Sequence, residues 1–466
     1  MQNQNADVQY NKMVNTPVWK LIITLAIPTI ISMLVTSVYN MADTFFVSQL
    51  GTEASAAVGI VFPIMSIIQA CGFTLGMGSG SLVSIRLGQK RNEEASVITS
   101  TAFFAAIGVG VLVTCFGNIF AQGVLSFIGA SESVLPYAKD YAGYIFWGAP
   151  FMCASFVLNN NLRSEGKAFF SMIALTTGGI LNMVLDPFFI FPELSIFGLH
   201  IKGLGLGISG AALCTLITQF ASFWLLFSFY LRRKAICHIS IKNITRDIRL
   251  LGNIVTTGLP SMARQGLASI ASIMLNKSAG LFGVSAIAAM AIVGKIIMFI
   301  ASMMIGIGQG FSPVSGYNYG AKRYDRVRKA YFFLVVTGAS VMAVFAILAV
   351  VFAPQIIQAF RDDPEVIEVG KVALRWQAAF LPLHAIIVGT NMLMQSTHHI
   401  KQATFLSMNR QGIYFIPAIL ILPHLFGLFG VEISQAVADL LSTFTAIPYL
   451  IWFFRKLPKE KACNSE

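Results

Sequence analysis

The chain has 466 residues, 56% of them hydrophobic and only 11% charged, and its mean hydropathy is +0.73. Soluble proteins carry roughly 25% charged residues, so a large soluble enzyme is excluded and lipid must surround much of the chain. The net charge is +12, but the basic residues lie in short loops between apolar runs, so they indicate membrane orientation and no nucleic-acid partner.

Twelve apolar runs follow one another along the chain, each long enough to cross the membrane, because roughly 20 helical residues span the hydrocarbon core. The predicted helices are 18–46, 54–83, 95–127, 135–160, 168–191, 207–231, 250–280, 284–312, 328–357, 366–394, 402–426 and 430–454. The first run is too long for the apolar part of a cleavable signal peptide. The sequence therefore predicts an all-α integral membrane protein with twelve transmembrane helices.

Basic residues alternate from one connection to the next. The even-numbered connections and both tails hold most of the lysines and arginines, for example Lys90, Arg163 and Lys322, whereas the odd-numbered connections hold few. Cytoplasmic loops are enriched in Lys and Arg. We therefore expect a multi-pass protein of the plasma (inner) membrane with both termini in the cytoplasm.

The chain repeats itself at an offset of 232 residues, and glycine and proline dominate the matches. The pairs include Pro28 and Pro260, Gly76 and Gly308, Gly78 and Gly310, Gly88 and Gly320, and Pro150 and Pro382. Since these residues mark backbone geometry, we expect two six-helix lobes of one fold in parallel orientation, 1–231 and 250–466, joined by a basic cytoplasmic linker, 232–249. The second lobe ends in a short cytoplasmic tail. Parallel repeats around a central site are typical of secondary transporters.

The first half carries two acidic residues within predicted helices. Asp43 lies late in the first helix and Asp186 in the fifth, where Asn182 precedes it by four residues on the same helical face. Pro187 follows and removes a backbone donor, which leaves an oxygen-rich pocket suited to Na⁺ or a proton. Two carboxylates that met in low dielectric would raise one pKa or admit a cation. The alternatives are an interfacial position for Asp43 and a structural polar patch at the kink.

The second half carries arginines instead. Arg264 and Arg410 each begin an Arg-Gln-Gly sequence, so Gln265 follows the first, and Asp439 in the last helix is a candidate partner. Charges inside the bilayer are costly and usually paired. Two interpretations remain open: the arginines contact substrate or release a counter-ion during transport, or they form permanent ion pairs within the lobe.

Motifs for other chemistry are missing from the sequence. The six cysteines show neither CxxC spacing nor pairing with histidine, so no metal site or disulfide is predicted. The glycine-rich stretch 76–80 lacks the Lys-Ser/Thr ending of a phosphate-binding loop. We therefore expect no cofactor, no enzymatic activity, and transport energy drawn from an ion gradient.

Several segments resemble the multidrug and toxic compound extrusion (MATE) family. They are Ile27-Pro28, the run from Tyr39 to Val47 with Leu50-Gly51, Leu87 to Lys90, Leu162 to Gly166, Asn182 to Pro187, and Gly210 to Ala212 with Thr215. The resemblance covers nearly the whole chain. It implies two lobes in a V and export of organic cations or drugs in exchange for H⁺ or Na⁺. We expect a monomer embedded in membrane lipid.

The resemblance also implies functional residues. Those matching Asp43, Asn182, Asp186 and Thr215 form the family's N-lobe cation site, and Asn159, Asn160 and Asn161 fall where it has polar residues lining the cavity. In the second half, the candidates for the cavity wall come from the intramembrane charges themselves and are Arg264, Gln265 and Arg410. One branch of the family has an acidic residue where this chain has Ala268, so coupling is expected in the N-lobe.

Two other functions compete with drug efflux. A flippase for a lipid-linked or anionic precursor is favoured by Arg264 and Arg410 and opposed by the acidic first half. A major-facilitator transporter shares the twelve-helix parallel architecture and a basic loop after the second helix, but it does not account for Asp186-Pro187.

Overall fold

The computed structural model describes residues 2–196, 199–245 and 247–458. Its elements in the first half are α1 (Gln2–Asn15), α2 (Val18–Ser48), α3 (Thr52–Gly88), α4 (Asn92–Ile119), α5 (Ala121–Ile128), α6 (Leu135–Ser164), α7 (Ala168–Ile190), β1 (Glu193–Ile196), β2 (Leu199–Lys202) and α8 (Gly207–Leu231). We refer to α2–α8 as the N-lobe.

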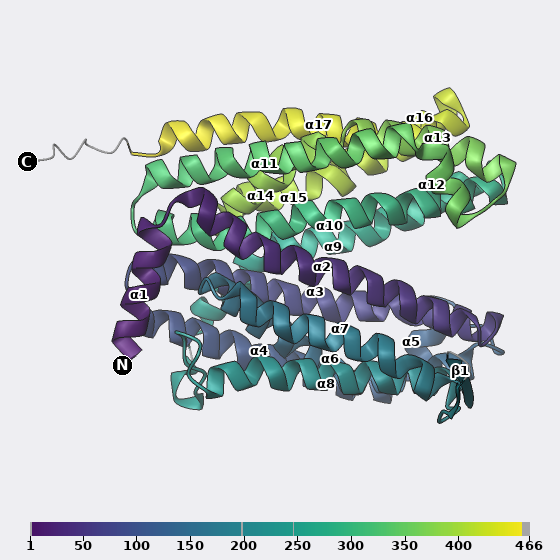
Figure 1. Ribbon diagram of the computed structural model, residues 1–466, viewed down its shortest axis with the longest axis horizontal. Coiled ribbons are helices and arrows are strands. Elements are labelled where there is room, and N and C mark those ends of the chain that lie inside the picture. Colours follow the sequence, from purple (N-terminus) through teal and green to yellow (C-terminus); the bar gives the residue numbers. More distant parts are fainter. Residues whose placement is uncertain (1, 197–198, 246, 459–466) are drawn as a thin grey trace, which may run out of the picture.

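The second half contains η1 (Ile241–Asn243), α9 (Ile248–Gly280), α10 (Val284–Gly320), α11 (Tyr324–Val351), α12 (Ala353–Phe360), α13 (Pro364–Ala379), η2 (Leu381–Leu383), α14 (His384–Ser396), α15 (Ile400–Met408), η3 (Asn409–Tyr414), α16 (Phe415–Phe426) and α17 (Leu428–Lys456). We refer to α9–α17 as the C-lobe. The two lobes lie side by side, with their helices running along the longest axis of the molecule (Figure 1).

Within the described residues, eleven helical segments are long and apolar enough to cross a membrane. The polar residues of α9, including Arg264 and Gln265, leave it out of that set, but it is 33 residues long and completes the bundle as its twelfth spanning segment. The predicted twelve-helix, all-α fold in two lobes is therefore confirmed.

The predicted helix limits differ from the structure at four interruptions. The third and ninth predicted helices are each divided, because α5 and α12 follow α4 and α11 as separate eight-residue helices. The tenth is interrupted at η2 around Pro382, which cannot donate a backbone hydrogen bond. The eleventh contains η3, a π-helical turn.

The 232-residue repeat marks places where the backbones of the two lobes touch. A Cβ atom on Gly88 would lie 2.2 Å from the carbonyl oxygen of Tyr317, and a Cβ atom on Gly320 would lie 2.2 Å from that of Ile85. Gly88 and Gly320 are counterparts in the repeat, and so are Ile85 and Tyr317. The two contacts are therefore equivalent, as an axis between the lobes requires.

A second pair of equivalent contacts lies further inside the bundle, on the same helices α3 and α10. A Cβ atom on Gly78 would lie 2.9 Å from the backbone nitrogen of Gly258, and one on Gly310 would lie 2.6 Å from that of Ala26. We call these four glycine contacts the glycine seam. Only glycine permits backbones to approach this closely. The seam lies toward the end of the molecule that bears both termini, and the lobes spread apart toward the other end (Figure 1).

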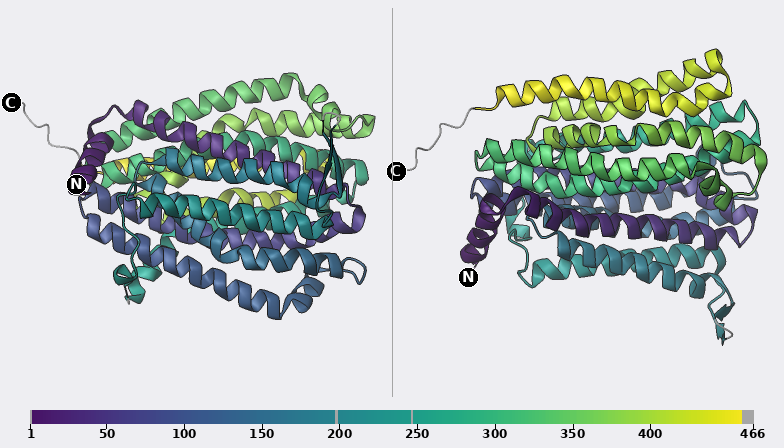
Figure 2. Two further views of the ribbon diagram at one scale, coloured as in Figure 1. Left: turned by 60° about the horizontal axis from the view of Figure 1, so that its bottom comes forward. Right: turned by 45° about the horizontal axis from the view of Figure 1, so that its top comes forward.

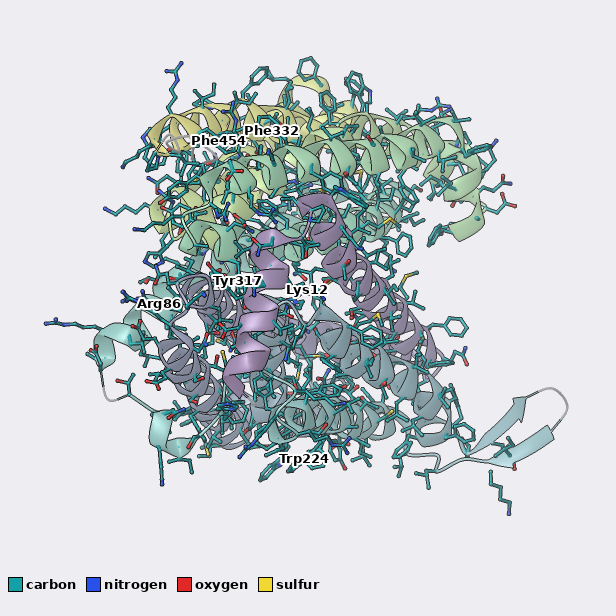
Figure 3. All side chains as sticks on the ribbon, turned by 60° about the vertical axis from the view of Figure 1, so that its left-hand side comes forward. Lys12, Arg86, Trp224, Tyr317, Phe332 and Phe454 are labelled. Atoms are coloured by element: carbon teal, nitrogen blue, oxygen red, sulfur yellow. The ribbon has the colours of Figure 1, made fainter. Side chains whose placement is uncertain are left out.

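Helix α1 crosses the boundary between the lobes at the end that bears the termini (Figure 3). On the N-lobe side, the Gln9 side chain donates to the backbone oxygen of Glu165 at 3.0 Å. On the C-lobe side, the Asn318 side chain donates to the backbone oxygen of Met13 at 3.3 Å, and Arg326 donates to that of Thr16. Helix α1 was not predicted from the sequence, and its contacts tie the two lobes together.

The linker between the lobes packs against the N-lobe. The Glu165 carboxylate accepts the backbone N–H groups of Ile236 at 2.6 Å and Cys237 at 3.1 Å. The Ser100 hydroxyl donates to the backbone oxygen of His238 at 2.9 Å. At the opposite end of the molecule, β1 and β2 form an antiparallel hairpin, with Glu193 paired to Lys202 (Figure 2).

Candidate functional site

The two acidic residues of the N-lobe lie on helices that approach each other closely. A Cβ atom on Gly179 of α7 would lie 2.9 Å from the Val35 side chain and 3.2 Å from the Tyr39 ring, so glycine allows α7 to lie against α2 at this level. Asn182 and Asp43 follow about one helical turn later on the same faces. The close approach therefore positions the polar groups of α2 and α7 beside each other.

Asp186 and Asn182 are buried within the N-lobe. The Asn182 side-chain amide donates to one carboxylate oxygen of Asp186 at 3.3 Å. Asp43 lies close enough to Asp186 for the two charges to interact. The sequence left open whether these carboxylates meet; in the structure they lie within electrostatic reach of each other, and we refer to Asp43, Asn182 and Asp186 as the acidic cluster.

Three oxygen atoms of this cluster lack a donor. Asp43 Oδ1, Asn182 Oδ1 and Asp186 Oδ2 are buried, and within the described part of the chain none has a hydrogen-bond partner. Buried acceptors are nearly always paired, and an unpaired one costs roughly 1–3 kcal/mol. A proton or a small cation would satisfy these oxygens, so the cluster fits the coupling ion that the sequence predicts.

Sequence reasoning missed three neighbours of the cluster. Tyr39 and the buried Tyr141 lie within electrostatic reach of both carboxylates. The Cys214 thiol lies 3.7 Å from the Asn182 side-chain nitrogen and 3.8 Å from its backbone oxygen. Tyrosine and cysteine in apolar runs look like packing residues, so no pattern in the sequence marks them.

Thr215 follows Cys214 and is therefore turned by roughly 100° around α8. Its backbone oxygen accepts the Thr218 hydroxyl at 3.0 Å. Among the described residues, its own hydroxyl has no hydrogen-bond partner. The cation-binding role that the resemblance implies for Thr215 stays a prediction.

The three consecutive asparagines of α6 are buried between helices. Asn159 accepts the hydroxyl of Ser171 on α7, and Asn161 accepts that of Ser79 on α3 at 3.1 Å. Asn160 accepts from Arg163 at 2.5 Å. In this conformation they join α6 to its neighbours, and their role in lining a cavity stays a prediction.

Arg163 forms a polar contact between the lobes. It is only 4% exposed, and its guanidinium donates to the side-chain oxygen of Gln309 on α10. The sequence suggested a cytoplasmic loop charge, because Arg163 stands near the end of an apolar run. The structure instead buries it beside the glycine seam, where it bridges the two lobes.

The C-lobe holds a buried charged cluster of its own. Arg410 contacts Asp439 at 2.6 Å, as the sequence suggested, and His384 Nε2 lies 2.9 Å from the other oxygen of Asp439. Gln435 donates to Asp439 at 3.0 Å. Arg410 lies in the π-helical turn η3, a feature that is frequent at functional sites.

Arg264 lacks such a partner. It lies on the face of α9 that includes the buried residues Thr257, Ser261 and Ala271, at helical spacing. Among the described residues, no acceptor pairs with its guanidinium, and its neighbour Gln265 is half-buried. Arg264 is therefore a cation on the buried face of α9 that has no partner in the described part of the chain.

Comparisons with known proteins agree with this architecture. The MatE family model matches residues 28–188 and 260–420, two stretches separated by the same 232 residues as the glycine repeat. The multidrug export protein MepA of Staphylococcus haemolyticus is 25% identical over 447 residues, with 96% of each chain covered.

Two solved structures are similar over almost their whole length. A MATE protein crystallised in complex with MaL6 has a TM-score of 0.88 and 27% identity, with 95% of this chain and 97% of that chain covered. A transporter of the MOP superfamily from Pyrococcus furiosus, described as having a binding pocket of reverse polarity, has a TM-score of 0.88 and 26% identity, with 96% and 98% covered. The chain therefore belongs to the MatE family, the multidrug and toxic compound extrusion family.

Proposed function

We propose that this protein exports small organic compounds, mainly cations, in exchange for H⁺ or Na⁺ that binds among Asp43, Asn182 and Asp186. The three buried oxygens Asp43 Oδ1, Asn182 Oδ1 and Asp186 Oδ2, which have no donor among the described residues, support a bound cation. Two carboxylates and an amide oxygen attract a cation, and the cation lowers the cost of burying them. The name of the MepA relative, a multidrug export protein, supports drugs as the substrate class.

The arrangement of the lobes supports alternating access. The glycine seam, the Arg163–Gln309 contact and α1 join the lobes at the end that bears the termini, whereas the lobes spread apart at the other end. With both termini in the cytoplasm of the plasma membrane, this conformation faces outward. Export then requires the seam to open so that substrate enters from the cytoplasm.

The cation is the trigger in this mechanism. When it binds to Asp43 and Asp186, it removes the repulsion between α2 and α7, so the two helices can close around it. Pro28 lies inside α2 and lacks the backbone donor that would stiffen the helix. We therefore expect α2 to bend near Pro28, which narrows the N-lobe and releases the substrate.

Ethidium transport in proteoliposomes tests the proposal. A pH gradient and a Na⁺ gradient are imposed separately, and uphill movement under one of them identifies the coupling ion. Asp43→Asn should abolish uphill transport and leave the folded protein intact. Asp140→Asn, which makes the same change at an exposed position of α6, is the matched control. Full uphill transport in Asp43→Asn would refute the assignment.

Arg264 favours a second candidate function, transport of compounds that bear an anionic group. An unpaired guanidinium on the buried face of a helix is suited to a carboxylate or phosphate. A fluoroquinolone with a free carboxylate and its methyl ester form a matched pair of probes. Arg264→Gln should reduce export of the acid and spare the ester under this second function, and should affect both alike if Arg264 only supports the fold.

A further inference from the structure

A cavity of about 540 Å³ lies where α1 turns into α2 and meets the start of α11. One wall comes from residues 14–15 and 17–19 and the other from the C-lobe. It is far from the cation site, which lies toward the opposite end of α2. Nothing in the exchange mechanism uses this cavity.

The C-lobe wall changes from charged to apolar along one face of α11. Arg323, Arg326 and Lys329 follow one another at three-residue spacing, and Phe333 comes one turn later on the same face. Asp325 is the one acidic residue in the lining, and it lies 4.0 Å from Lys329. The wall therefore has an excess of positive charge next to an apolar part of the cavity. We call the two aromatic side chains of the lining, Trp19 and Phe333, the aromatic floor.

These cations differ in what they already bind. Arg326 donates to Asn318 at 2.9 Å and to the backbone oxygen of Thr16, so it holds the end of α1 in place. Arg323 is exposed, and among the described residues no acceptor pairs with its guanidinium. Arg323 is thus available to an anion, and so is Lys329, because its side chain is 75% exposed and its ion pair with Asp325, at 4.0 Å, is long.

The cavity lies at the depth of the lipid headgroups. Helix α11 has 28 residues and is therefore roughly 42 Å long, whereas the hydrocarbon core is about 30 Å thick. Its first turns consequently extend into the headgroup layer, and Phe333 reaches the acyl chains. On the facing wall, Val18 is buried and Trp19 is 55% exposed, and tryptophan is enriched at this interface.

We propose that this cavity binds the headgroup of an anionic phospholipid from the leaflet at the end that bears both termini. The phosphate lies against Arg323 and Lys329, and an acyl chain follows Trp19 and Phe333. A soluble anion would match the cations but not the aromatic floor, and a neutral lipid would match the floor but not the cations. The observations together select an anionic lipid.

The proposed lipid also stabilises the closed seam. It contacts α11 of the C-lobe and the corner between α1 and α2, and α1 is bonded to the N-lobe through Gln9. Because α1 and its junction with α2 are bonded to the N-lobe through Gln9 and to the C-lobe through Arg326, these contacts cannot all persist when the lobes part, and the cavity changes shape. The lipid therefore binds more tightly to the conformation in which the seam is closed.

Thermal melting of the purified protein tests the proposal. The protein is titrated with dioctanoyl phosphatidylglycerol, dioctanoyl phosphatidylcholine or inorganic phosphate, and the affinity is taken from the rise in Tm. We expect phosphatidylglycerol to bind at least ten-fold more tightly than phosphatidylcholine. Each basic residue near an anionic lipid contributes roughly five-fold, so Arg323→Gln with Lys329→Gln should weaken binding about 30-fold.

The control is the double variant Lys242→Gln with Lys401→Gln, which removes two exposed charges outside the cavity and should leave binding unchanged. Lys329→Gln alone should weaken binding roughly five-fold, and it serves if the double variant does not fold. Equal affinity for the two lipids, or no effect of the cavity variants, would overturn the proposal. Displacement of phosphatidylglycerol by inorganic phosphate at equal concentration would also overturn it and assign the cavity to a soluble anion.

Discussion

One methyl group at Gly88 should separate the two lobes at the end that bears the termini. A Cβ atom there would lie 2.2 Å from the Tyr317 oxygen, about 1.2 Å short of an ordinary contact of 3.4 Å. Gly320 stands in the equivalent position, 2.2 Å from the Ile85 oxygen. The neighbour in each case is backbone within a helix, so the overlap cannot be relieved by a side-chain rotation.

The magnitude follows from the cost of overpacking, about 1–3 kcal/mol. This cost falls on the conformation with the closed seam and is absent once the lobes part. Gly88→Ala and Gly320→Ala should therefore each shift the equilibrium toward the opened seam by about 5- to 150-fold. The two variants should behave alike, because they perturb equivalent contacts.

Pulsed electron paramagnetic resonance measures the shift directly, with spin labels at Glu93 of the N-lobe and Arg328 of the C-lobe, both exposed. Gly88→Ala should increase the population at longer distances. Gly59→Ala and Gly294→Ala are the controls in the same two helices, since a Cβ atom at either position meets nothing within 4 Å. Unchanged distances in Gly88→Ala and Gly320→Ala would show that the seam does not govern the conformation.

Three further changes probe the remaining polar contacts. Asp439→Asn leaves the positive charge of Arg410 without a counter-ion and should destabilise the protein by about 3–5 kcal/mol; the melting temperature checks this, and addition of Arg410→Gln should recover part of the loss. Glu165→Ala removes two hydrogen bonds that hold the linker, so limited proteolysis should cut within 232–249 at least ten-fold faster, and an unchanged rate would contradict this role. Gln309→Ala leaves Arg163 without its partner in the other lobe and should lower both Tm and the closed population, measured with the same spin labels.

The spanning helices could be predicted because lipid imposes length and apolarity on them. The predicted run 207–231 has the limits of α8, and 168–191 differs from α7 by one residue. Helix α1 could not be predicted in this way. Its sequence is polar, and its position depends on contacts of Gln9 and Met13 with segments far away in the chain.

The candidate site was predicted in part for a similar reason. Asp43, Asn182 and Asp186 are conspicuous because polar groups are rare in apolar runs. The close approach of α2 to α7 depends on Gly179. The sequence does not reveal which helix lies against this glycine. Arg163 was wrongly predicted to be an exposed loop residue. An arginine at the end of an apolar run has the same sequence context whether it faces water or the other lobe.

The glycine seam lowers the entropic cost of bringing the two lobes together. Glycine has no side-chain rotamers to lose, whereas ordering a long side chain such as arginine or glutamine costs up to about 2 kcal/mol. The backbone groups in contact, such as the Tyr317 and Ile85 oxygens, lie within the helices α10 and α3. Closing the seam therefore immobilises no side-chain torsions at the glycines. The entropic cost of closing falls on the few side chains that pair between the lobes, such as Arg163 and Gln309.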